Sequence, residues 1–198
     1  AVGAATRLYV LGGCGLVDQR GLAVAECYDP DAGAWARLPP MPTARSFWGA
    51  AAACVVSRRI YVVGGADDDT GRTFERYDLA SRSWEELPPL RSARVGCAVA
   101  GAGGKLFLFG ASAPPDEPIA AAECYDPHSG LWTSLALMPS ARRSAAAAAA
   151  SGKIYIVGGV GCSWDDVAPV ECFDCRRGCW KALPPLPVRV PRCAAALL

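Results

Sequence analysis

The sequence predicts an all-β fold built from four repeats of short antiparallel strands, and three observations support this prediction. Apolar runs that end in paired glycines recur along the chain, as in residues 60–65 (IYVVGG). The pattern Glu-x-aromatic-Asp follows each run after a polar loop. A lone tryptophan closes each repeat, with spacings of 49, 48 and 48 residues. Such self-similarity at a fixed period indicates a repeat architecture. The tryptophans are Trp35, Trp84, Trp132 and Trp180.

Each repeat resolves into four strands, and the second repeat shows their order most clearly. Residues 46–56 form the first strand, residues 59–63 the second, residues 74–78 the third and residues 84–87 the fourth. The glycines that end the second strand permit a sharp turn, because they have no Cβ atom to obstruct a neighbouring strand. Prolines that follow the fourth strand remove hydrogen-bond donors, which is tolerated at a sheet edge.

The alanine-rich first strand of the fourth repeat is the least obvious of these predictions. Residues 145–150 are all alanine, and alanine is the best helix former. The repeat nevertheless places this run at a first strand, and helix propensity is only a weak guide. We therefore expect a strand, in which small side chains suit the crowding where neighbouring repeats converge.

The repeats fill the chain as one domain. Their approximate bounds are residues 7–44, 45–93, 94–141 and 142–189, followed by a lone first strand at residues 190–198. Because residue 7 already begins a second strand, we expect the first repeat to lack its first strand. The lone strand could complete that repeat and close a ring of four. Since both ends stop within the pattern, we favour a segment of a larger ring.

Composition excludes several classes of partner. The net charge is +1, from 20 basic and 19 acidic residues, and 52% of the residues are hydrophobic. This balance gives no electrostatic footprint for a nucleic acid and no polybasic patch for a membrane surface. The longest uncharged apolar run, residues 46–57, is shorter than the roughly 20 residues that span a bilayer. We expect neither nucleic acid nor membrane as a partner.

Ten cysteines raise the question of disulfides and metals. Cys27, Cys124 and Cys172 hold the same position in three repeats, which should separate them by more than the ~7 Å that a disulfide allows between Cα atoms. We expect buried free thiols, a reducing compartment and hence a cytoplasmic location. Cys172, Cys175 and Cys179 could supply three zinc ligands, but Cys172 belongs to the repeat pattern and no second pair completes a site. We predict no metal and no cofactor.

Catalytic signals are weak. The single histidine, His128, falls in a predicted turn, and one histidine excludes the usual His-based zinc sites. The sequence contains no Gly-x-Ser-x-Gly, P-loop or HExxH motif. We therefore expect that the protein is not an enzyme.

The repeats resemble the kelch family over nearly the whole chain, through the paired glycines, the Glu-x-aromatic-Asp motif and the tryptophan spacing. The resemblance implies a β-propeller of radial blades, each with four antiparallel strands. Kelch propellers more usually have six or seven blades, which again favours a larger ring. The resemblance also implies a protein–protein interaction module, such as the substrate-recognition part of a BTB–kelch ubiquitin-ligase adaptor.

In the kelch adaptors that this chain resembles, the loops after strand two and the crossovers between blades form one face that binds a ligand. Arginine and tryptophan on such a rigid face are enriched at binding hot spots, and arginine pairs well with carboxylates. We expect a peptide or globular protein partner with an acidic or phosphorylated segment. The residues of this predicted binding rim are Arg45, Ser46, Arg94, Arg142, Arg143, Ser144, Arg20, Arg72 and Trp164.

A glutamate also recurs in every repeat, and an inter-strand ion pair or backbone hydrogen bonds are its expected role. These residues are Glu26, Glu75, Glu123 and Glu171. Two other functions stay open for the chain. One is a non-metal enzyme on a kelch scaffold, such as a sugar mutarotase or specifier-like protein, which would need convergent acids on the rim. The other is an actin-binding kelch protein.

Overall fold

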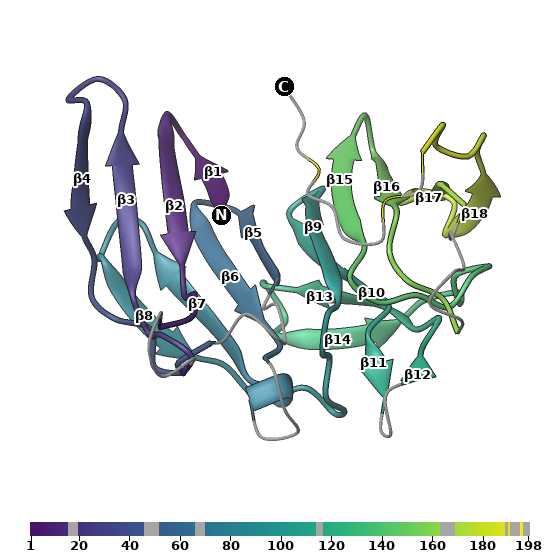
Figure 1. Cartoon of the computed structure of the whole chain (residues 1–198), viewed down its shortest axis with the longest axis horizontal. Helices are drawn as coiled ribbons and strands as arrows, with labels where there is room; N and C mark the ends of the chain where they lie inside the picture. Colours follow the sequence, from purple (N-terminus) through teal and green to yellow (C-terminus); the bar gives the residue numbers. More distant parts are fainter. Residues whose placement is uncertain are drawn as a thin grey trace. The chain divides into compact units, whose positions relative to one another are not determined.

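The computed structural model describes residues 1–15, 20–45, 52–65, 70–113, 117–162, 169–188, 190 and 195. It contains four antiparallel four-stranded sheets, one for each repeat, which confirms the predicted all-β architecture (Figure 1). We call these sheets blades 1 to 4. The chain divides into two compact units, Ala1–Ala93 and Arg94–Leu198, and each unit contains two blades.

The first unit holds blades 1 and 2, and each follows the strand order of its sequence. Blade 1 comprises β1 (Val2–Ala4), β2 (Arg7–Leu11), β3 (Ala25–Asp29) and β4 (Ala34–Arg37). Blade 2 comprises β5 (Ala52–Val56), β6 (Arg59–Val63), β7 (Phe74–Asp78) and β8 (Ser83–Glu86), with the 3₁₀ turn η2 (Thr70–Arg72) before β7.

The second unit holds blades 3 and 4, together with a two-stranded hairpin. Blade 3 comprises β9 (Ala98–Ala102), β10 (Lys105–Phe109), β13 (Ala122–Asp126) and β14 (Leu131–Ser134). The hairpin pairs β11 (Ser112–Ala113) with β12 (Glu117–Pro118). Blade 4 comprises β15 (Ala146–Ala150), β16 (Lys153–Val157), β17 (Glu171–Asp174) and β18 (Cys179–Ala182).

Two predictions about first strands have different outcomes. The alanine run is a strand, because β15 pairs with β16 in register from Ala146 with Val157 to Ala150 with Lys153. The expectation that blade 1 lacks its first strand is wrong. Its β1 pairs with β2 through a tight turn at Ala5, where φ is 54°. The lone strand predicted at residues 190–198 lies almost wholly outside the described residues.

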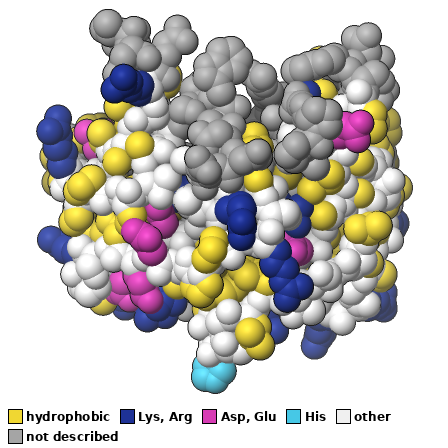
Figure 2. Space-filling model, turned by 90° about the horizontal axis from the view of Figure 1, so that it is seen from below, with side chains coloured by type: hydrophobic (Ala, Val, Ile, Leu, Met, Phe, Trp, Pro, Cys, Tyr) yellow, Lys and Arg dark blue, Asp and Glu magenta, His cyan; other side chains and the backbone are white. Residues whose placement is uncertain are grey.

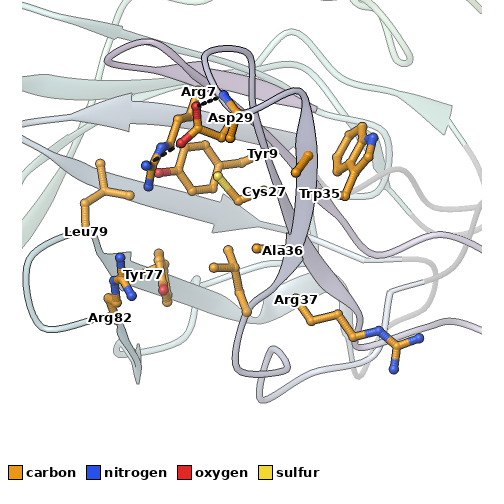
Figure 3. Close-up of a pocket in the computed structure, with 13 residues that line it drawn as sticks. Arg7, Tyr9, Cys27, Asp29, Trp35, Ala36, Arg37, Tyr77, Leu79 and Arg82 are labelled. Carbon is orange, nitrogen blue, oxygen red and sulfur yellow. Dashed lines mark hydrogen bonds and ion pairs between the residues drawn. The ribbon is translucent and has the colours of Figure 1, made fainter.

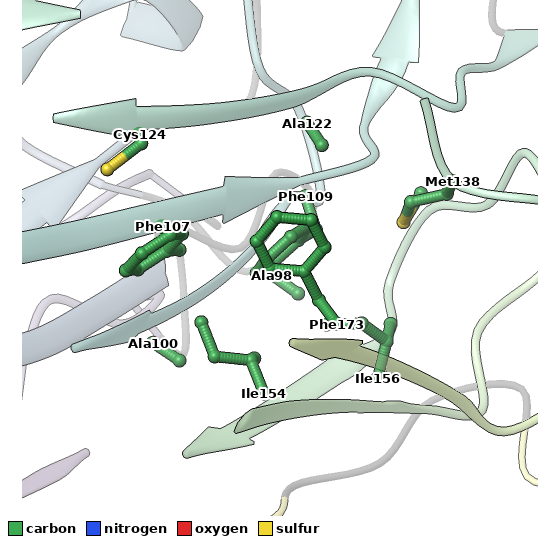
Figure 4. Packing of buried hydrophobic residues seen from close by; sticks show 10 residues of the cluster. All are labelled: Ala98, Ala100, Phe107, Phe109, Ala122, Cys124, Met138, Ile154, Ile156 and Phe173. Atoms are coloured by element: carbon green, nitrogen blue, oxygen red, sulfur yellow. The ribbon is translucent and has the colours of Figure 1, made fainter. Parts of the chain in front are cut away.

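Facing sides of neighbouring blades form the core of each unit. In the second unit, Phe107, Phe109 and Phe173 pack with Ile154 and Ile156 between blades 3 and 4 (Figure 4). The first strands β9 and β15 also lie against each other. Small alanine side chains on both strands allow this close approach, so the alanine run serves packing. Both the sequence repeat and the packing of the core therefore explain why the alanine run is a strand.

The same turn joins the third and fourth strands of every blade, and an aspartate organises it. In blade 2, the Asp78 carboxylate accepts hydrogen bonds from the backbone amides of Ala80 at 2.8 Å and Ser81 at 3.1 Å. The turn then requires a residue with positive φ, which glycine adopts without strain. The residues at this position are Gly33 (62°), Arg82 (56°), Gly130 (73°) and Gly178 (67°).

Candidate interaction surface

Two crossovers between blades, one in each unit, are held by backbone hydrogen bonds at the glycine end of a second strand. The carbonyl of Arg45 accepts from the amide of Gly13 at 3.2 Å, and that of Arg142 accepts from Ala111 at 3.1 Å. The fit at the crossover between blades 3 and 4 leaves no room for a side chain at Gly110. A Cβ atom on Gly110 would lie 2.2 Å from the Arg142 carbonyl oxygen. The glycine at the end of the second strand therefore allows the crossover to lie close against the blade that it leaves.

Two crossover arginines turn their side chains into the following blade. Arg45 pairs with Glu75 at 3.0 Å, and the two side chains are only 2% and 1% exposed. Arg142 pairs with Glu171 at 3.0 Å, with 1% and 0% exposed. Each guanidinium also donates to a glycine carbonyl at the end of a second strand, Arg45 to Gly64 and Arg142 to Gly158. Burial lowers the pKa of the Arg142 guanidinium, and the Glu171 carboxylate opposes this shift.

Arg94 repeats the arrangement with Glu123, at 2.7 Å. The structure therefore corrects the prediction that Arg45, Arg94 and Arg142 present guanidinium groups on the binding rim. They lie inside because a buried glutamate is costly unless a cation pairs with it. The expected ion-pair role is confirmed for Glu75, Glu123 and Glu171, whereas Glu26 forms none of the ion pairs among the described residues.

The other rim candidates lie closer to the surface. Arg143 is half-buried, and its guanidinium donates to the Ser112 hydroxyl at 3.1 Å. Ser144 is also half-buried, and its amide donates to the Gly96 carbonyl at 2.7 Å. Arg72 is exposed, yet its Nε donates to the Leu90 carbonyl at 2.9 Å. Arg20 is exposed in the loop after β2. Ser46 and Trp164 lie outside the described residues.

Surface charge is mixed on the face that Figure 2 shows, where basic and acidic side chains are interspersed among the described residues. His128 is exposed at its turn (Figure 2, cyan). It lies at the tip between β13 and β14, away from the crossover end of blade 3. This position agrees with the turn predicted from the sequence.

The tryptophans of the fourth strands differ in exposure: Trp84, Trp132 and Trp180 are half-buried, whereas Trp35 is exposed. The indole of Trp84 donates to the Pro39 carbonyl at 2.8 Å, and that of Trp180 to the Ala136 carbonyl at 2.9 Å. Each thus contacts the blade before its own. Trp35 is 54% exposed, and its ring contacts Tyr28 of its own blade.

The cysteines form neither a disulfide nor a metal-binding cluster among the described residues. All nine that the structure describes are free thiols. Burial raises the pKa of Cys54 to about 12 and that of Cys124 to about 11, so both thiols stay protonated at neutral pH. The described residues contain no cluster of three or more His, Cys, Asp or Glu side chains placed to hold a metal. They also contain no helix with the length and apolar character needed to cross a membrane.

The first unit contains a cavity of about 360 Å³ that was not predicted from the sequence (Figure 3). Its lining includes Tyr9 and Tyr77 together with Arg82. A signal was present in the repeats, since Arg82 stands where the other three blades have glycine. That departure is visible only once the turn is aligned across blades.

Comparison with known proteins decides the family. A family model described as the KLHDC2/KLHL20/DRC7 Kelch-repeats domain matches residues 1–197. The chain belongs to the kelch-repeat family. Its four blades are therefore kelch blades, and the family supports a general role as a protein-interaction module.

Several kelch proteins are similar over part of the chain. Kelch-like protein 25 of Xenopus tropicalis is 29% identical over 109 residues, covering 55% of this chain and 18% of the relative. Human Kelch repeat and BTB domain-containing protein 13 is 31% identical, covering 52% and 22%. F-box/kelch-repeat protein SKIP20 of Arabidopsis thaliana is 43% identical over 60 residues, covering 29% and 14%. The chain thus spans about a fifth of the length of these relatives.

Proposed function

We propose that this kelch chain binds a protein partner through the residues at the crossover end of its blades. The observation that supports this most directly is that some arginines of the crossovers and loops are buried, whereas others lie at or near the surface. Arg45 and Arg142 are locked inside as scaffold. Arg20, Arg72 and Arg143 remain at or near the surface of loops that the rigid blades position. Loops on a rigid scaffold are the usual carriers of binding function.

The chemistry of these residues favours an acidic partner segment. Guanidinium groups form charge-assisted, often bidentate hydrogen bonds with carboxylates and phosphates. We propose that the partner presents an acidic or phosphorylated segment to this surface. In the wider protein, a role as the substrate-recognition part of a ubiquitin-ligase adaptor is supported by relatives whose names include a BTB domain or an F-box. The free thiols suit a reducing compartment such as the cytoplasm.

A peptide array tests the binding proposal without a known partner. Acidic and phosphorylated peptides are compared with their glutamine-substituted or unphosphorylated forms, and binders are then titrated by fluorescence polarisation. We expect charge-dependent binding that Arg143→Ala weakens. Arg177→Ala is the matched control, because Arg177 is exposed in the turn at the other end of blade 4's third strand. Equal binding of charged and neutralised peptides, or equal loss in both variants, would contradict the proposal.

No feature of the described residues specifically favours the enzymatic or the actin-binding alternative. The adaptor role has a separate test, which uses the full-length protein. Co-purification of a cullin with that protein, lost on removal of a BTB or F-box segment, would support it. If the protein bound peptides but no cullin co-purified with it, the proposal of an interaction module would stand and the proposed adaptor role would be contradicted.

A further inference from the structure

Although Arg37 and Leu38 extend it to the far end of β4, most of the lining of the first unit's cavity lies at the end of the strands that is remote from the crossovers. Arg7 begins β2 there, Asp29 ends β3, and Tyr77 lies near the end of β7 (Figure 3). Its volume of about 360 Å³ falls within the range of roughly 300–1,000 Å³ that is typical of small-ligand sites. The cavity therefore lies mainly outside the surface proposed to bind a protein.

Tyr77 supplies a hydroxyl without a hydrogen-bond partner in the protein. The residue is 2% exposed, and its Oη atom has no partner among the described residues. An unsatisfied buried hydroxyl is unfavourable, and each such group in a native structure calls for an explanation. Burial raises the pKa of this hydroxyl, so it stays protonated and able to donate at neutral pH. A ligand acceptor in the cavity would satisfy it.

Arg82 supplies a positive charge at a strained position. Its φ is 56°, where the other blades use glycine, and a non-glycine residue in this region is unfavourable. The side chain lies beside Tyr77 and Leu79 in the cavity lining (Figure 3). Arg82 takes part in none of the ion pairs formed by the described residues. An arginine kept at a glycine position without a scaffold partner indicates a role for its guanidinium.

The second unit provides an internal comparison at the equivalent blade junction. Its aromatic side chains lack hydroxyls and pack into a closed apolar core. The scaffold therefore needs neither the hydroxyls nor the arginine of the first unit. The equivalent pairs are Tyr9 and Phe107, Tyr77 and Phe173, and Arg82 and Gly178.

Charge and shape of the lining define the ligand class. Arg7 and Asp29 neutralise each other through an ion pair of 2.6 Å. Arg37 and Arg82 also line the cavity and take part in none of the ion pairs of the described residues, so the lining carries a net positive charge. Leu38 and Leu79 form an apolar wall. We propose that this cavity binds a small organic oxyanion, either a carboxylate or a phosphate monoester, that carries an apolar body. The Arg82 guanidinium and the Tyr77 hydroxyl hold the oxyanion, and the leucines contact the body.

Benzoate, phenyl phosphate and the neutral benzyl alcohol are suitable probes for ligand-observed NMR titration. We expect saturable binding of benzoate or phenyl phosphate, and no saturable binding of benzyl alcohol. Whichever anion binds identifies the recognised group. Arg82→Gly and Tyr77→Phe should each weaken binding at least about tenfold, as expected for loss of a hydrogen bond to a charged group. Both changes install the residue that another blade already uses, so folding should be retained.

Matched controls separate the cavity from general charge effects. Arg58→Gly removes another exposed arginine with positive φ, and Tyr28→Phe removes a hydroxyl from the equivalent strand position of blade 1. Neither residue lines the cavity, so both variants should bind like the unmodified protein. Failure of both anions to bind below about 10 mM would overturn the proposal. So would equal binding of benzyl alcohol, or unchanged binding by folded Arg82→Gly and Tyr77→Phe variants.

Discussion

Arg45 and Arg142 each join two blades of one unit through different parts of the same residue. The backbone carbonyl of Arg142 binds the glycine turn of blade 3, while its guanidinium reaches Glu171 and Gly158 of blade 4. Buried ion pairs are not intrinsically strong, because desolvation of both charges opposes their attraction. Their removal is nevertheless costly when one charge stays behind. The arginine therefore matters most through what its loss would leave unpaired.

Arg142→Ala should lower the free energy of unfolding by about 3–5 kcal/mol, because Glu171 would remain buried without its partner. Urea unfolding followed by tryptophan fluorescence measures the loss. Arg143→Ala is the control, since the neighbouring side chain is only half-buried, and we expect a change of about 1 kcal/mol or less. Equal effects from the two variants would contradict a scaffold role confined to Arg142.

Arg82→Gly should have the opposite sign. Relief of the left-handed conformation should raise stability by about 1 kcal/mol, partly offset by the greater freedom of glycine in the unfolded chain. Thermal unfolding of the variant provides the measurement. A gain in stability together with a loss of oxyanion binding would separate function from folding at this residue. A clear loss of stability would instead assign the Arg82 side chain to the scaffold.

At the scale of single elements, the turn between the third and fourth strands concentrates charge. Its aspartate caps the turn and also pairs with a basic residue that begins the second strand. The pairs are Arg7 with Asp29 at 2.6 Å, Arg59 with Asp78 at 2.9 Å, and Lys105 with Asp126 at 3.1 Å. The last residue of the Glu-x-aromatic-Asp motif thus ties three strands together, a role that its sequence position alone did not indicate.

The turn predicts a defined acid sensitivity. The hydrogen bond from Arg59 and those from the turn amides lower the pKa of Asp78 from 3.8 to about 2. Because the folded value lies below the unfolded one, the contribution to stability is complete above about pH 4 and is lost as the pH falls towards 2. The melting temperature should therefore drop in this window. Asp78→Asn should flatten the drop, while Asp31→Asn, in the turn of blade 1, serves as the charge control.

The tryptophans of the fourth strands should differ in energetic importance. Trp180→Ala should cost about 3–5 kcal/mol, because it removes packing and a hydrogen bond to the preceding blade. Trp35→Ala should cost about 1 kcal/mol or less, since its indole is largely exposed. Denaturant titration of both variants checks the ranking. A larger loss from Trp35→Ala would mean that its contact with Tyr28 outweighs inter-blade packing.

At the scale of the whole molecule, periodicity was sufficient to predict the blades. Apolar runs, glycine pairs and turn aspartates each determine structure within one repeat. Because the pattern occurs four times, the same strand prediction is made independently in each repeat. The predicted third strand at residues 74–78 coincides with β7 (Phe74–Asp78). The first strand of blade 1 escaped prediction because Val2–Ala4 is short and carries little apolar signal. Repetition supplies what a single short strand cannot.

Side-chain direction could not be predicted in the same way. An arginine beside a loop is long enough to reach solvent or an interior carboxylate, and the sequence leaves both possible. Recurrence of a glutamate in every repeat favoured an ion pair or backbone hydrogen bonds for the glutamate, yet the rim prediction placed Arg45 and Arg142 outside. The cavity was missed for a related reason. The cavity depends on residues at which blades 1 and 2 depart from the repeat pattern, whereas the prediction relied on the residues that all the repeats share.

The ion pairs all point in one direction along the chain, and this has a consequence for synthesis. Arg94 precedes Glu123 by 29 residues. In the other two buried pairs the arginine also precedes the glutamate: Arg45 before Glu75 and Arg142 before Glu171. As the chain leaves the ribosome from its N-terminus, each carboxylate emerges after the cation that will neutralise it. Blades 2 and 4 can therefore each close onto a preceding blade whose crossover already carries the counter-charge.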